Sequence, residues 1–163
     1  MGIRVLIPSG ALGLNYNKEA LKIGLKKKPD IIAIDGGSTD SGPSYLGEGI
    51  SKYSRVSTKV EWKALMEARE KAKIPLLIGT AGTCGTDSAV NWFLDITHEI
   101  AQELNQSLKI VIVRCSQDKS EVLKAYSKGK IQPLPNAPEL SNEVISNCQN
   151  IVALAGVEQI IDA

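Results

Sequence analysis

The 163-residue sequence has little of several residue types that would point to a particular chemistry. It contains one histidine, and its three cysteines, Cys84, Cys115 and Cys148, are far apart and form no Cys-x-x-Cys pair. This usage argues against a disulfide framework and against a zinc site. We predict no metal site, and the sequence names no particular cofactor. Aromatic residues make up only 4% of the chain, so its aliphatic and glycine patterns carry most of the information.

The chain also lacks a strong charge of either sign and any long apolar run. Lys and Arg number 19 against 18 Asp and Glu, and this net charge of +1 excludes the overall electrostatic character of a nucleic-acid-binding domain. No run approaches the roughly 18 apolar residues of a membrane span, and the start MGIRVLIPSG is unlike a signal peptide. We expect a cytoplasmic protein whose partner is a small anionic molecule, with no nucleic-acid and no membrane partner.

What the sequence does contain is an alternation of short aliphatic runs and amphipathic segments. Branched aliphatic residues predict five strands, at residues 4–8, 30–35, 73–78, 108–113 and 151–154. Helical spacing and capping residues predict helices between them, at residues 17–28, 58–71, 87–104, 118–129 and 141–148. This order predicts an α/β fold, a Rossmann-like three-layer sandwich with a mainly parallel sheet of about five strands and helices on both faces. We expect residues 1–163 to form a single α/β domain.

Glycines gather in three segments that each begin where a predicted strand ends, at residues 9–13, 35–49 and 79–87. The carboxyl ends of parallel strands lie at one edge of the sheet, where such folds bind ligands, so the pattern predicts one composite site. The alternative is that each glycine only forms a tight turn. The predicted ligand-binding residues are Ser9, Gly10, Gly36, Gly37, Ser38, Thr39, Tyr45, Gly79, Thr80, Ala81, Gly82 and Thr83.

The loops also contain the residues that could carry chemistry. Asp35 and Asp40 could share a proton, form an acid–base pair or hold a hard cation, and the alternative is that both only shape turns. The loop at 79–87 runs into a predicted helix, so its amides and threonine hydroxyls predict a nest for a phosphate or a carboxylate. It is no P-loop, because no Gly-Lys-Ser/Thr follows, and the first strand is not followed by a Gly-x-Gly-x-x-Gly motif.

Three stretches are distinctive in their order and spacing: PDIIAIDGGSTDSGPSYLGEG, IPLLIGTAGTCGTDSAVNWFLDITHEIA and the final IVALAGVEQIIDA. Together they resemble the acyclic terpene utilisation (AtuA-like) family, whose members carry D-x-G-S-T-D-x-G-P-x-Y-L-G and I-P-L-I-I-G-[ST]-A-G segments. The resemblance implies catabolism of branched acyclic terpenoids and related small carboxylic acids or thioesters, and a chain that corresponds to the amino-terminal portion of a larger architecture. Positions that match the family motifs are Asp35, Ser38, Thr39, Asp40, Tyr45, Gly79, Ala81 and Gly82.

From the residues and the resemblance we predict an enzyme or enzyme subunit that acts on a small carboxylic acid or thioester. Lyase, hydratase or isomerase chemistry suits Asp35 and Asp40 as catalytic residues in a chain without a redox motif. Two alternatives stay open: a non-catalytic ligand-binding or regulatory subunit that needs a partner chain, and a nucleotide-binding domain. Trp62 and Trp92 fall off the apolar stripes of their helices, which indicates contact with another chain or coverage by a neighbouring helix. We therefore also expect a homo-oligomer or a complementary protein chain.

Overall fold

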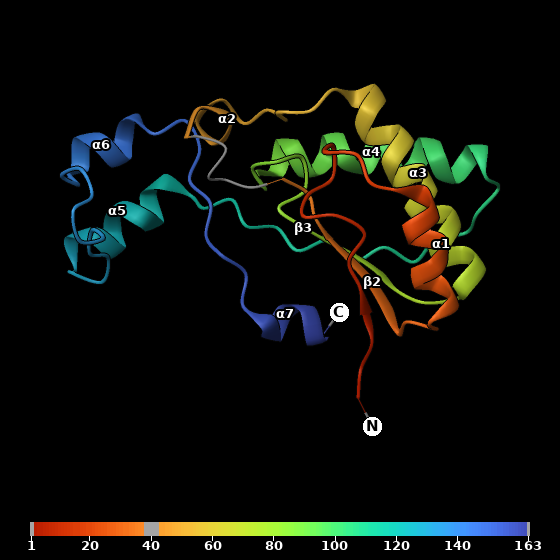
Figure 1. Cartoon of the computed structure of the whole chain (residues 1–163). Coiled ribbons are helices and arrows are strands. Elements are labelled where there is room, and N and C mark those ends of the chain that lie inside the picture. The colour runs from red at the N-terminus through yellow and green to blue at the C-terminus, as the bar shows by residue number, and fades with distance from the viewer. Residues whose placement is uncertain (1, 38–42, 163) are drawn as a thin grey trace.

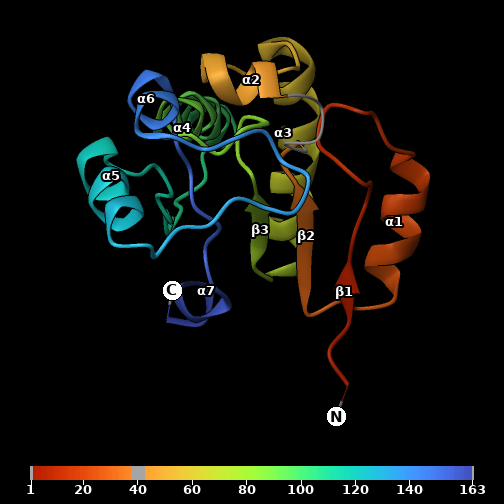
Figure 2. The same ribbon diagram turned by 90° about the vertical axis from the view of Figure 1, so that its left-hand side faces the viewer.

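The computed structural model describes residues 2–37 and 43–162. Within these residues the chain forms seven helices and one sheet of three parallel strands in the order β1-β2-β3 (Figures 1 and 2). The mixed α/β class is confirmed. The strands are β1 (Val5–Leu6), β2 (Ile31–Asp35) and β3 (Leu76–Gly79). The helices are α1 (Lys18–Lys26), α2 (Pro43–Glu48), α3 (Arg55–Ala72), α4 (Asp87–Glu103), α5 (Lys119–Ser127), α6 (Asn142–Asn147) and α7 (Val157–Asp162).

Helix starts follow the local capping chemistry. The Asn17 side chain accepts from the amides of Glu19 and Ala20 at the start of α1, and Thr86 and Asp118 cap α4 and α5 in the same way. Helix α3 begins earlier than the predicted residue 58 because Ser54 caps it: the Ser54 hydroxyl accepts from Ser57 N at 3.1 Å. The sequence reading missed α2 and α7, which are each only six residues long.

One face of the sheet carries the core. The register Leu6–Ile32–Leu76 directs these side chains to one side, and Ile34 and Ile78 follow two residues later on the same side. Helices α1, α3 and α4 cover this face and contribute the other core residues, among them Leu21, Leu65, Met66, Phe93, Ile96 and Ile100. The hydrophobic face of the sheet and the apolar stripes of these helices thus form the principal core of the molecule.

Trp62 belongs to this core. Its ring meets Phe93 edge-on with centroids 4.7 Å apart, and its indole Nε1 donates to the Thr97 hydroxyl at 3.0 Å. Thr97 in turn donates to the Phe93 carbonyl at 2.9 Å. Coverage by a neighbouring helix, rather than contact with another chain, therefore explains the position of Trp62 off the stripe of α3.

The opposite face of the sheet has no helical cover, and here the prediction of a three-layer sandwich was wrong for the described residues. Val5 is 52% exposed and Leu77 38% exposed on this face, which we call the open face. The helices expected to cover it pack elsewhere. Helices α5 and α6 pack against each other, Tyr126 donates to the Leu140 carbonyl at 2.6 Å, and the pair stands apart from the sheet as an arm (Figure 1).

The predicted fourth strand at residues 108–113 is absent from the sheet. None of the backbone hydrogen bonds among the described residues joins this segment to β3. The segment nevertheless runs in the direction expected of a strand that follows α4. Leu108 packs against the core beyond the end of α4. Arg114 Nη2 donates to Asn91 Oδ1, near the start of α4, at 2.8 Å. The segment thus runs back along α4 without forming a ladder.

The predicted fifth strand at 151–154 also differs. Val152 forms an isolated antiparallel bridge with Ser116, with Gln117 N donating to the Ile151 carbonyl at 2.8 Å and Ala153 N donating to the Cys115 carbonyl at 2.9 Å. A sheet of about five mainly parallel strands was therefore an overestimate. The aliphatic runs were recognised, but their pairing depends on tertiary contacts that periodicity does not encode. No helix among the described residues is long and apolar enough to cross a membrane.

Candidate functional site

The three glycine-rich loops meet at the carboxyl ends of the strands, as their positions in the sequence predict. Leu12 N donates to the Asp35 carbonyl at 2.8 Å, which joins the first loop to the second. Gly36 N donates to the Gly79 carbonyl at 2.6 Å, and Thr83 N donates to the Gly36 carbonyl at 3.1 Å, which joins the second loop to the third. Their convergence is confirmed, and ligand binding by them stays a prediction.

Glycine is required where the second and third loops touch. A Cβ on Gly36 would lie 2.6 Å from the carbonyl oxygens of Gly79 and Thr80. A Cβ on Gly37, whose φ is +126°, would lie 2.7 Å from the Cα of Thr83. Backbone atoms cannot move aside as a flexible side chain can, so these two glycines first serve the close approach of the loops.

Thr83 is the centre of the loop cluster rather than an open ligand contact. It is 1% exposed and has a φ of +75°, which is rare for a β-branched residue. Its hydroxyl accepts from Lys52 N at 3.1 Å and lies 3.3 Å from the Ser51 hydroxyl. Thr80 also has a positive φ, +47°. Such strain persists only where the surroundings impose it, and it is concentrated at functional sites.

Asp35 is half-buried at the end of β2, and its side chain lies on the open-face side of the sheet, in register with Gly79. Its Oδ1 accepts from Gly37 N at 3.0 Å, which is the turn-forming contact that the sequence left as an alternative. The predicted catalytic residue Asp40 and the predicted ligand-binding residues Ser38 and Thr39 lie outside the described residues.

The other predicted ligand-binding residues differ in how accessible they are. Gly10 and Gly79 are exposed with open space around them, and Ser9, Tyr45 and Thr80 are half-buried. Gly82 is buried against Ala89 of α4, and Ala81 packs against the core. The open positions leave room for a ligand, whereas the packed ones hold the third loop against α4.

The anion nest expected in the third loop is largely occupied by internal bonds. Gly85 N donates to the Ala81 carbonyl at 3.2 Å, Asp87 N to the Ser116 hydroxyl at 3.0 Å and Ala89 N to the Thr86 hydroxyl at 3.2 Å. The Asp87 carboxylate also stands in the first turn of α4, where it already complements the helix dipole. An anion at this position would have to displace these bonds and approach a negative charge.

A cavity of about 280 Å³ lies beside the loop cluster, between the end of the second loop and the first turns of α4. Its wall includes Ser51, which contacts Thr83, and Ser88, whose hydroxyl donates to the Gly49 carbonyl at 3.1 Å. Apolar and charged side chains complete it: Ile50, Tyr53, Arg55, Ala89 and Trp92. The sequence reading missed these residues as site residues, although the position of Trp92 off the stripe of α4 was a signal for this wall.

Arg55 is the cationic group of this cavity. Its Nη1 donates to Glu99 of α4 at 2.6 Å, and its side chain is 45% exposed. A guanidinium has five N–H donors, so one bond to Glu99 leaves capacity for an anionic ligand. The cavity lining therefore combines one guanidinium that can exchange its partner, the hydroxyls of Ser51 and Ser88, and the aromatic side chains of Tyr53 and Trp92.

The buried carboxylate of Glu61, on α3, fixes the end of the first loop through hydrogen bonds to its backbone. Glu61 of α3 is 8% exposed and accepts from Gly13 N at 2.7 Å and from Asn15 N at 2.9 Å. Tyr16 donates to the Glu61 carbonyl at 2.7 Å. Burial, and then the charges of Glu61 and Glu67, raise the pKa of Tyr16 above its ordinary value, so this hydroxyl remains a donor.

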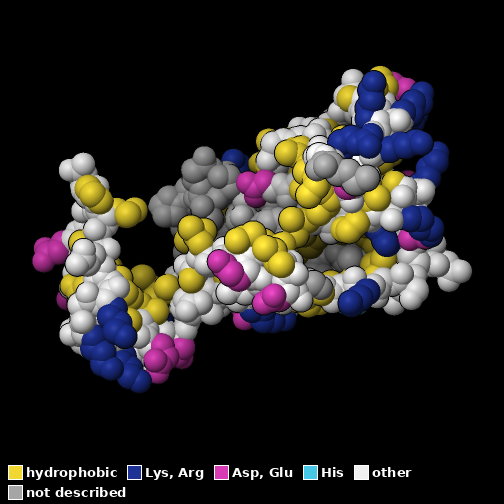
Figure 3. Space-filling model, turned by 90° about the horizontal axis from the view of Figure 1, so that it is seen from below, with side chains coloured by type: hydrophobic (Ala, Val, Ile, Leu, Met, Phe, Trp, Pro, Cys, Tyr) yellow, Lys and Arg dark blue, Asp and Glu magenta, His cyan; other side chains and the backbone are white. Residues whose placement is uncertain are grey.

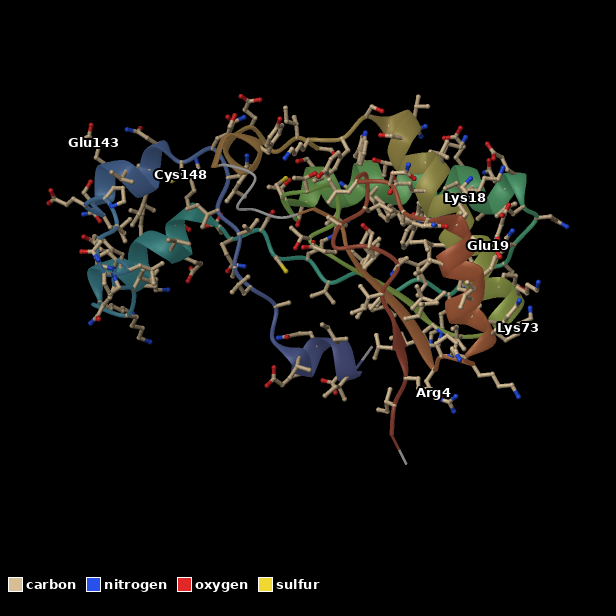
Figure 4. All side chains as sticks on the ribbon, viewed as in Figure 1. Arg4, Lys18, Glu19, Lys73, Glu143 and Cys148 are labelled. Carbon is tan, nitrogen blue, oxygen red and sulfur yellow. The ribbon has the colours of Figure 1, made fainter. Side chains whose placement is uncertain are left out.

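Cysteine and metal chemistry find little support at this edge. Cys84 is 1% exposed, with its sulfur 3.3 Å from the Thr86 hydroxyl, so it packs inside the third loop as a small side chain and is not open to a ligand. Cys148 is half-buried at the end of α6, on the arm that α5 and α6 form. This arm and α1, which carries Lys18 and Glu19, lie on opposite sides of the molecule (Figure 4). Across residues 2–37 and 43–162 no cluster of three His, Cys, Asp or Glu side chains could hold a metal ion.

A comparison with known protein families finds no model that matches the chain, and no curated protein or solved structure matches it. The resemblance to the AtuA-like family therefore stays a prediction that rests on its motifs.

Proposed function

We propose that the chain binds a small carboxylic acid or its thioester at the carboxyl edge of the sheet, as an enzyme or an enzyme subunit. The observation that carries this proposal is the cavity of about 280 Å³ beside the converging loops. Ligand pockets start at about 300 Å³, so a cavity of this size suits a compact metabolite better than a dinucleotide. The occupied amides of the third loop also count against the nucleotide-binding alternative.

The lining favours an acid with a short hydrocarbon body. Trp92, Tyr53 and Ile50 offer apolar surface, and Arg55 offers a guanidinium that matches a carboxylate in a bidentate pair. The hydroxyl of Ser51 would donate to the second carboxylate oxygen or to a thioester carbonyl, and the hydroxyl of Ser88 would do so if it gave up its bond to the Gly49 carbonyl. Glu99, the present partner of Arg55, keeps its bonds to Lys59, so a ligand can take Arg55 without leaving Glu99 unpaired.

Acid–base chemistry by Asp35 and Asp40, of the lyase, hydratase or isomerase type, is a separate part of the proposal. Asp35 stands on the open-face side of the sheet, and the cavity stands on the helix side. The link between them is the contact of Gly37 with Thr83, whose hydroxyl reaches Ser51. A substrate held by Arg55 would have to extend over this link for its reacting carbon to approach Asp35.

A thermal-shift titration tests the binding proposal. We expect isobutyrate at ten times its Kd to raise the unfolding midpoint by about 3–6 °C, and isobutyramide, its uncharged analogue, to have a smaller effect. Arg55→Gln should remove the preference for the acid. Lys63→Gln is the matched control, because Lys63 also lies on α3 and pairs with α4, through Glu103 at 2.7 Å, but does not line the cavity. Equal shifts with acid and amide in the unchanged protein would contradict the proposal.

A second candidate is a ligand-binding or regulatory subunit that is completed by another chain or by a second copy. The open face favours it, because parallel sheets normally have both faces covered. Val5 and Leu77 are exposed on that face, and Val157, Ile160 and Ile161 are exposed on α7. Seen from below, hydrophobic side chains gather over the middle of the molecule, with Lys and Arg mainly toward its two ends (Figure 3). In this candidate the added chain covers the sheet, and residues 108–113 can pair with β3 in a larger Rossmann-like sheet.

A further inference from the structure

The cationic residue of the proposed carboxylate site already has a carboxylate partner within the fold. Arg55, which lines the cavity of about 280 Å³, donates from Nη1 to Glu99 Oε2 at 2.6 Å. Glu99 belongs to α4 and is not among the described residues that line the cavity. A ligand carboxylate that reaches Arg55 therefore meets a guanidinium whose charge is already balanced.

Glu99 is held beside Arg55 by a second partner. Its Oε1 accepts from Lys59 Nζ, and Lys59 lies four residues after Arg55 on α3. Lys59 also pairs with Glu103, four residues after Glu99 on α4. The side chains of Arg55 and Glu99 are 45% and 40% exposed, so their bond can open without disturbing the core. Lys59 keeps the Glu99 carboxylate near Arg55 when that bond opens.

A carboxylate fixed beside Arg55 weakens every anion that uses Arg55 by about the same factor. The guanidinium has five N–H donors but only one positive charge, so Glu99 and a ligand carboxylate compete for that charge and repel each other. An uncharged ligand in the cavity does not meet this competition. An anion regains affinity only by burying hydrocarbon against the apolar lining, which consists of Ile50, Tyr53, Ala89 and Trp92.

We infer that Glu99 is a built-in competitor of the carboxylate site, which keeps small anions off Arg55 and restricts the site to acids with a hydrocarbon body. Glu99 acts through Arg55 and is therefore a specificity-determining residue outside the cavity. This inference rests on the proposed binding of a carboxylic acid at Arg55. It adds which acids the site accepts and which residue excludes the others.

Nuclear magnetic resonance titration of the whole ¹⁵N-labelled chain tests the inference by measuring the Kd of isobutyrate, formate and isobutyramide. In the unchanged protein, formate should bind about tenfold or more weakly than isobutyrate, because it buries no hydrocarbon body. We expect Glu99→Gln to tighten isobutyrate and formate about two- to fivefold each, the range for one exposed charge pair, and to leave isobutyramide unchanged. A merely structural role of Glu99 would give weaker binding instead.

Two further variants show whether the effect of Glu99 passes through Arg55. Glu103→Gln is the matched control, because it removes the same charge from α4, and the described partners of Glu103 are Lys59 and Lys63. It should leave the Kd of isobutyrate unchanged. In a chain that already carries Arg55→Gln, the addition of Glu99→Gln should have no effect on this Kd, because the competition needs the guanidinium.

The outcomes separate this inference from the proposed function. If the unchanged protein prefers isobutyrate to isobutyramide but Glu99→Gln binds isobutyrate equally or more weakly, the inference is overturned and the carboxylate site stands. Equal tightening by Glu103→Gln, or in the Arg55→Gln chain, would also overturn it, because the effect would then not pass through Arg55. If the unchanged protein shows no preference for the acid, the carboxylate site is removed and the inference with it.

Discussion

At the scale of single residues, the sequence predicts which side chains lie at a strand end, but it does not predict their hydrogen-bond partners. Asp35, Gly36 and Gly37 lie at the end of β2, as the run DIIAID followed by glycines predicts. The role of Thr83 was out of reach, because its hydroxyl contacts Ser51 and Lys52, which precede it by 32 and 31 residues. A hydroxyl in a glycine-rich loop looks like a ligand contact until its own partners are known.

The proposed proton-transfer role of Asp35 can be separated from its turn-forming role. Asn keeps the Oδ1 that accepts from Gly37 N, so Asp35→Asn should fold with little change in unfolding midpoint. We expect turnover of a substrate acid to fall about 100-fold or more, the usual effect of losing a general acid or base. Asp30→Asn is the control, because Asp30 stands at the other end of β2 and also accepts a backbone amide, from Arg4 at 2.7 Å. Equal turnover by the unchanged protein and Asp35→Asn would remove Asp35 from the mechanism.

At the scale of elements, helices with a clear apolar stripe were predictable. Helix α4 matches its predicted range closely, because capping at Thr86 and the spacing of Phe93, Ile96 and Ile100 act locally. The strand at 108–113 failed for a non-local reason, since β-branched residues favour an extended backbone but cannot choose a partner strand. The cavity residues were missed because they come from three parts of the chain, residues 49–53, the start of α3 and the start of α4, that meet only in the fold.

Helices α3 and α4 are also joined by a surface network whose strength depends on pH. Lys59 pairs with Glu99 and Glu103, and Lys63 pairs with Glu103 at 2.7 Å. Hydrogen bonds from Lys59 and then Lys63 lower the pKa of Glu103 to about 2, and bonds from Lys59 and Arg55 lower the pKa of Glu99. Because both pKa values are depressed in the folded state, the network stabilises the fold above the ordinary carboxyl pKa of 4.5. That stabilisation is lost as the pH falls from there toward about 2.

We therefore expect the unfolding midpoint to decrease below about pH 4.5 and to decrease less in Lys59→Met. The difference should be small, because the pairs are exposed to solvent and to salt. Lys124→Met is the control, since among the described residues Lys124 pairs within α5, with Glu121 at 3.7 Å. Parallel pH curves for the unchanged protein and Lys59→Met, measured by circular dichroism, would show that the network does not contribute.

At the scale of the whole molecule, the α/β class and the convergence of the loops were predictable, and the layering was not. The α/β class follows from the alternation of strand and helix patterns. The meeting of the loops at one edge of the sheet follows because parallel strands place their carboxyl ends at the same edge. Among the described residues the third layer is missing because α5 and α6 pack against each other, where Ile145 of α6 is buried, and not against the sheet. An amphipathic pattern predicts that one face of a helix is buried, but it does not predict which other element packs on that face.

Amide hydrogen exchange measures this layering directly. The amides of residues 109–113 make no ladder with β3, so in the isolated chain they should exchange about 100-fold or more faster than those of Ile32 and Ile34 in the central strand. The second candidate function adds that a partner chain covering the open face should slow exchange at 109–113. Strong protection of 109–113 in the isolated chain would instead establish a four-stranded sheet.

Asn150 gives the molecule a particular order of completion. Its side-chain amide donates to the carbonyls of Leu46 and Gly47 at 3.2 and 2.7 Å, across 104 and 103 residues, and so holds the end of α2 beside the cavity residue Gly49. During synthesis on a ribosome these two hydrogen bonds form only after residue 150 has emerged, and closing so long a loop is slow. The cavity of the proposed ligand site would therefore be completed last, and a nascent or truncated chain that ends before residue 150 would build the core while this cavity stays unfinished.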